Sequence, residues 1–146
     1  MEYTLNQYIA VLQGNAFIKE TKKIGNNLVV TYYSTFDEFI TDNQDSSFTR
    51  EEFDNYFLTG DKIKKIIVGE PVRILREFPE IYAVTLNINE YHTHVYRTKL
   101  FKYLGFDVSE LSVEDGSWNE KFANKYIGDK EGREKFFIDF ICNQKY

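Results

Sequence analysis

The chain has 146 residues, and its 42% hydrophobic and 28% charged side chains give the balance of a globular domain rather than a disordered segment. Eight glycines and two prolines exclude collagen-like and proline-rich architectures. The formal net charge of −5 argues against a general nucleic-acid binder, which needs a basic face to neutralise phosphates. This length buries enough surface to fold without metal ions or disulfides, so we expect one α+β domain over residues 1–146.

The single cysteine excludes an intrachain disulfide, and no apolar run approaches the roughly 20 residues that cross a bilayer. The first residues lack the basic and apolar regions of a signal peptide. We therefore expect a cytoplasmic protein without a membrane span. An exported or lipid-anchored protein is the alternative if an apolar leader precedes Met1 in the encoded reading frame.

The first half of the chain carries clear helix and hairpin patterns. Apolar spacing predicts a helix over residues 4–13, and two β-prone runs around a Gly/Asn cluster predict a hairpin over about 16–33. Three segments fit the capping box, in which a hydroxyl and a carboxylate three residues apart bond to each other's backbone N–H. They predict helix starts at Thr35–Glu38, Thr49–Glu52 and Ser117–Glu120, with helix ends at Gly60, Gly105 and Gly128.

The second half predicts further helices and another hairpin. We expect two helices over 61–78, broken near Gly69 because Pro71 suits a first helical position; a strand over 64–68 is the alternative. Alternating residues predict a hairpin over about 82–98 that turns at Asn89–Glu90, followed by helices over 99–104 and 129–143. The expected fold class is α+β: a helix-rich compact domain in which helices pack two antiparallel hairpins.

Both histidines lie in the second hairpin, at His92 and His94. With a two-residue loop, Val84 pairs with Val95, and the histidines share a polar face with Tyr96; a three-residue loop would turn them toward the apolar face. Two imidazoles on one face are compatible with a metal site, but no third ligand is evident. We expect a solvated or interface-facing surface with no metal and no cofactor. The alternative is a metal-binding protein or enzyme centred on 91–98.

Residues 35–61 form the most acidic segment, with eight carboxylates against one arginine, or −7. Acidic residues in first turns stabilise helices, which explains part of this charge. An EF-hand loop is excluded because Phe48 occupies the position that needs glycine. The remaining charge, with the Tyr and Phe residues of this segment, is suited to steering a basic partner. The candidate binding residues are Asp42, Asp45, Glu51, Asp54 and Tyr56, together with His92, His94 and Tyr96.

No motif for nucleophilic, nucleotide-dependent or redox catalysis is present, and Cys142 is expected to be a buried hydrophobic residue. We therefore expect a non-enzymatic binding domain whose working surface is the acidic segment 35–61. Its expected partner is another protein with a basic surface.

Overall fold

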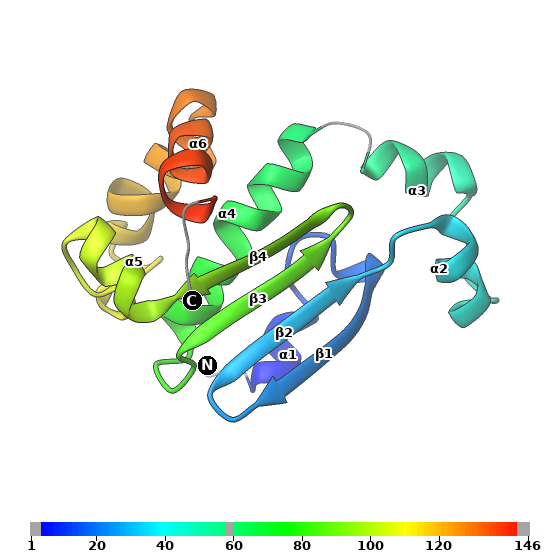
Figure 1. Cartoon of the computed structure of the whole chain (residues 1–146), viewed down its shortest axis with the longest axis horizontal. Helices are drawn as coiled ribbons and strands as arrows, with labels where there is room; N and C mark the ends of the chain where they lie inside the picture. Colours follow the sequence, from blue (N-terminus) through cyan, green and yellow to red (C-terminus); the bar gives the residue numbers. More distant parts are fainter. Residues whose placement is uncertain (1–3, 58–59, 143–146) are drawn as a thin grey trace.

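A mixed sheet of four strands organises the fold (Figure 1). The computed structural model describes residues 4–57 and 60–142. The two predicted hairpins are confirmed: β1 pairs antiparallel with β2, and β3 with β4. They are not separate, however, because β2 and β3 pair in parallel and join them into one sheet. An isolated hairpin is marginally stable in water, and this pairing satisfies the inner backbone edge of each. The strands are β1 (Ile18–Ile24), β2 (Asn27–Tyr32), β3 (Ala83–Ile88) and β4 (Tyr91–Tyr96).

Helices make up most of the rest of this α+β domain. None of those described is long and apolar enough to cross a membrane. The helices are α1 (Leu5–Ile9), η1 (Asn15–Phe17), α2 (Phe36–Asp42), α3 (Arg50–Tyr56), α4 (Gly60–Glu77), α5 (Arg97–Leu104), η2 (Val108–Glu110), η3 (Asn119–Ile127), α6 (Lys130–Phe136) and η4 (Phe137–Ile141).

One face of the sheet carries the core. In Figure 1, α1 and α4 lie behind the sheet, and the apolar residues of β2, β3 and β4 alternate toward that side. Val30, Leu86 and Val95 on this face are fully buried. The side chains between them point to the opposite face and are half-buried or exposed. The sheet therefore has one packed face and one polar face.

Helix α4 corrects two expectations. Residues 60–77 form one continuous helix with Pro71 inside it, rather than two helices or a strand. A proline within a helix removes one backbone hydrogen bond and costs about 3 kcal/mol. Ile67, Val68 and Ile74, around the proline, are fully buried, and burying each such side chain contributes about 1.5–3 kcal/mol. Packing on the sheet thus outweighs the local preference to break the helix.

Of the three predicted capping boxes, the one at Thr49 is confirmed. The Thr49 Oγ1 accepts from the Glu52 backbone N–H at 3.1 Å, and Glu52 accepts from Thr49 N–H at 3.0 Å. Thr35 caps α2, but the Glu38 carboxylate accepts from Ser34 N–H instead of from Thr35. That box is therefore only half formed.

The third predicted helix start is correct, since helical backbone begins at Ser117, but its capping box does not form because the hydroxyl of Ser117 is used within the preceding loop. It accepts from Ser112 N–H at 2.8 Å, and η3 begins after Trp118 without a side-chain cap.

The predicted helix ends are correct in two cases. Gly105, with a φ of 86°, ends α5, and Gly128 follows η3. Gly60 begins α4 instead of ending a helix.

The C-terminal part contains two π-helical segments, η3 and η4. The predicted last helix, over 129–143, corresponds to α6, which Asp129 caps, and to η4, which continues it; its predicted end, Asn143, lies outside the described residues. Cys142 is exposed, which corrects the expectation that it is buried. At the other end of the chain, α1 ends at Ile9, four residues earlier than predicted.

Candidate functional site

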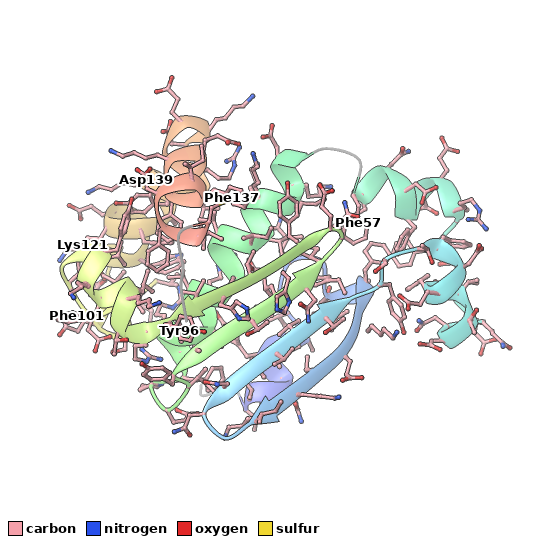
Figure 2. The ribbon with its side chains drawn as sticks, viewed as in Figure 1. Phe57, Tyr96, Phe101, Lys121, Phe137 and Asp139 are labelled. Carbon is pink, nitrogen blue, oxygen red and sulfur yellow. The ribbon has the colours of Figure 1, made fainter. Side chains whose placement is uncertain are left out.

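The histidine strand has the predicted register. Val84 pairs with Val95, and His92 and His94 stand opposite Asn87 and Thr85 on the polar face of the sheet. Their ring centroids are 4.6 Å apart and the ring planes are nearly perpendicular. Tyr96 follows on the same face, near α5 (Figure 2), with its ring centroid 6.2 Å from that of His94.

Hydrogen bonds across the strands fix both imidazoles. The Asn87 amide donates to Thr31 Oγ1 at 3.2 Å, so its carbonyl oxygen faces His92 and accepts from the Nδ1–H of that ring. A hydrogen bond of 2.8 Å joins His94 Nδ1 to Thr85 Oγ1. Partial burial, with a smaller contribution from His92, lowers the pKa of His94. The histidines are therefore held as parts of the sheet surface.

The structure places no third metal ligand beside the histidines. Within residues 4–57 and 60–142, no group of three His, Cys, Asp or Glu side chains is arranged to hold a metal ion. Zinc sites in proteins are almost always built from three or four protein ligands.

The acidic segment forms a separate unit, which we call the acidic lobe: α2, α3 and the residues around them, 36–57. Its interior is an aromatic cluster built around Phe17 of η1. Ring centroids of Phe39, Phe48, Phe53, Tyr56 and Phe57 lie 5.0–5.6 Å from that of Phe17.

The aromatic residues of the lobe are therefore mainly core. Tyr56 is half-buried, and the ammonium of Lys62 lies 4.3 Å from its ring centroid. Phe48 keeps 38% of its surface exposed. The lobe thus presents little aromatic surface of its own.

The lobe's carboxylates lie on the outside. Two of them have cationic partners: Asp37 pairs with Arg50, and Glu38 with Lys19 at 2.8 Å. The carboxylates among the predicted binding residues are all exposed, and none forms an ion pair with a described Lys, Arg or His: Asp42, Asp45, Glu51 and Asp54. The candidate residues thus divide into two places, the lobe and the histidine strand.

A pocket of about 250 Å³ lies where the lobe meets the tip of the β3–β4 hairpin. Figure 2 shows Phe57 at this junction. We call this cavity the junction pocket; Tyr33, Ser34, Phe53, Asp54, Phe57 and Asn89 line it. Of the predicted site residues, Asp54 alone contributes to it.

The sequence analysis missed a charged stripe on α4. Glu70 is only 1% exposed, and its carboxylate accepts from Gln13 N–H at 3.1 Å and pairs with Arg73. Burial raises the pKa of Glu70 above its usual range, against the opposing effect of Arg73. One turn further on, Arg76 is 8% exposed.

Arg76 connects α4 to two distant segments. It donates to the hydroxyl of Tyr8 at 3.0 Å and pairs with Glu77 at 2.8 Å. Its guanidinium lies 4.4 Å from the Trp118 ring centroid, at the start of η3. The stripe therefore ties α1 and η3 to α4.

Two cavities flank the stripe. One of about 480 Å³ includes Arg76, Glu77 and Ser112, and one of about 390 Å³ includes Glu70 and Arg73; Tyr8 lines both. In the sequence, the stripe is visible as a spacing of three residues from Glu70 to Arg73 and again from Arg73 to Arg76, which makes successive charges neighbours on the helix surface. Because these charges bond mainly to one another and to Tyr8, the stripe serves first to fix the packing of three segments.

The chain was compared with known proteins. No family model matches it, and neither a curated protein nor a solved structure does.

Proposed function

We propose that this protein is a non-enzymatic binding module and that its acidic lobe docks a basic segment of another protein. The observation that carries the proposal is the set of exposed carboxylates at Asp42, Asp45, Glu51 and Asp54, none with an ion-pair partner in the described chain. A carboxylate without an internal ion pair is available to a cation from outside.

The lobe's construction supports this role. The rings around Phe17 give α2 and α3 a packed interior, which supports Asp42, Glu51 and Asp54 on the helices, while Asp45 lies in the loop between them. The segment 35–61 carries −7, more than the whole chain. Such a local field speeds encounter with a positively charged partner and weakens as salt rises.

A fluorescent twelve-residue peptide with six arginines is a suitable probe. Its fluorescence anisotropy measures its binding to the parent protein and to two double variants. Asp45→Lys/Glu51→Lys alters the lobe; we choose this pair because Asp42 accepts a hydrogen bond from Tyr33. Glu114→Lys/Glu120→Lys makes the same change in net charge near η3, far from the lobe in Figure 1.

We expect the lobe variant to weaken binding roughly tenfold at low salt, because exposed charge pairs each contribute about 0.2–1 kcal/mol. The control variant should bind within about threefold of the parent, and parent binding should fall as salt rises. Equal losses in both double variants would show that net charge alone attracts the peptide and would refute the lobe as the docking surface. Circular dichroism confirms that each variant is folded.

A further inference from the structure

We propose that the junction pocket receives a single arginine side chain of the basic partner, with Asp54 as its counter-charge. This inference rests on the proposed function and names the chemical group that the lobe recognises.

The pocket's size and lining fit one side chain. Its volume of about 250 Å³ is below the roughly 300–1,000 Å³ of pockets that hold whole small-molecule ligands. Phe53 and Tyr33 are buried beneath the pocket, and the half-buried Phe57 is the aromatic residue of its lining that keeps exposed surface. Asp54, Ser34 and Asn89 are exposed and form a polar rim.

An aromatic ring beside a carboxylate is chemically complementary to a cation. Ring faces attract cations, and Asp54 supplies the opposite charge. Arginine suits this lining better than lysine, because its planar guanidinium stacks on rings and is more weakly hydrated than an ammonium group. The side-chain oxygens of Ser34 and Asn89 are acceptors for further N–H groups, and a guanidinium has five to donate.

The lobe already contains an arrangement of this kind. The guanidinium of Arg50 lies 5.1 Å from the centroid of the Phe36 ring and pairs with the carboxylate of Asp37. An arginine from outside would repeat that combination of ring and carboxylate at Phe57 and Asp54. The charge of −7 over residues 35–61 favours a cationic occupant over an anionic one.

The position of the pocket also favours a side chain from a partner. Asn89 lies in the two-residue turn of the β3–β4 hairpin, with a φ of 52°, a left-handed conformation that asparagine tolerates better than most residues. This turn contributes Asn89 to the lining, so an inserted side chain would contact both the lobe and the β3–β4 hairpin.

The test uses N-acetyl-arginine amide and its neutral isostere N-acetyl-citrulline amide as probes, followed by NMR of ¹⁵N-labelled protein. We expect the arginine probe to bind in the millimolar range and to shift the amide signals of Ser34, Asp54 and Asn89, with no such shifts from citrulline. Asp54→Asn should weaken arginine binding at least fivefold. Glu114→Gln, the same charge change at an exposed position outside the lobe, should leave it within twofold.

Equal effects of the two substitutions, or equal shifts from arginine and citrulline, would overturn the arginine assignment. The proposed function is tested separately by the arginine peptide. If Asp45→Lys/Glu51→Lys weakens peptide binding but Asp54→Asn does not, the lobe still docks basic segments and the pocket is not the arginine site. If only Asp54→Asn matters, the pocket assignment stands and docking over the wider lobe is refuted.

Discussion

Gly132 is the position where the structure leaves the least room for a side chain. A Cβ atom built there would lie 1.8 Å from the backbone carbonyl oxygen of Lys125, whereas real Cβ contacts are essentially never under 3.0 Å. The segments α6 and η3 would therefore have to separate by at least 1.2 Å, the difference between these distances. Gly132→Ala thus tests the close crossing that joins α6 to the π-helical segment η3.

The expected cost has three parts. Overpacking costs about 1–3 kcal/mol, and losing the cap from Asp129 to the Gly132 N–H costs about 0.5–2 kcal/mol. The greater helix propensity of alanine returns up to about 1 kcal/mol. We expect Gly132→Ala to lower the free energy of unfolding by about 0.5–5 kcal/mol, which corresponds to a Tm lower by roughly 2–15 °C in a domain of this size.

Gly128→Ala is the matched control. Its nearest neighbour, the carbonyl oxygen of Ala123, lies at 3.6 Å from the position of the added Cβ, and its φ of −76° suits any residue. We expect no loss of stability there, and a gain of up to about 1 kcal/mol. Urea unfolding followed by far-UV circular dichroism measures both variants. Unfolding free energies within 0.5 kcal/mol of each other would refute the close crossing.

Two further predictions concern the lobe core and the charged stripe. Thr49→Ala should lower the free energy of unfolding by about 1 kcal/mol, because the cap of α3 is lost. Phe53→Ala should lower it by about 3–5 kcal/mol, because the Phe53 side chain is 2% exposed and its ring centroid lies 5.1 Å from that of Phe17. Urea unfolding that matches the parent in both variants would contradict the packing of the lobe. Burial raises the pKa of Glu70 in the folded state, so its contribution to stability is fully present below the unfolded value of about 4.5 and is lost as pH rises through the folded value. In urea unfolding, the stability of Glu70→Gln relative to the parent should therefore be equal or higher at pH 7 than at pH 4. A variant that instead loses stability relative to the parent between pH 4 and pH 7 would show that the ion pair with Arg73 outweighs burial.

Local patterns predicted the histidine strand well. The register of β3 and β4 depends on alternating residues and a two-residue turn, both of which lie within residues 82–98. The parallel pairing of β2 with β3 joins segments 50 or more positions apart, such as Asn27 with Ala83. Alternation within each strand contains no information about that partner, so the single sheet was not predictable in this way.

Helix α4 shows a second reason for error. Pro71 is a strong local signal, but it acts on one hydrogen bond, whereas the neighbouring isoleucines and valines are buried over several turns. No pattern in the sequence singled out Glu70 and Arg76 for burial, because charged residues are rarely buried. Their burial depends on Tyr8, Gln13 and Trp118, which come from distant parts of the chain.

The two charged regions differ in where their partners come from, and this difference supports the lobe as the proposed docking surface. In the stripe, Glu70 and Arg76 are buried, and their partners belong to the same chain, so the charge is largely neutralised internally. In the lobe, Asp45, Glu51 and Asp54 are exposed and have no cation among the described residues. An uncompensated field extends about 8–10 Å into solvent at physiological salt, whereas a compensated one does not. The proposed recognition of a basic partner therefore rests on the lobe, whereas the stripe ties α1 and η3 to α4.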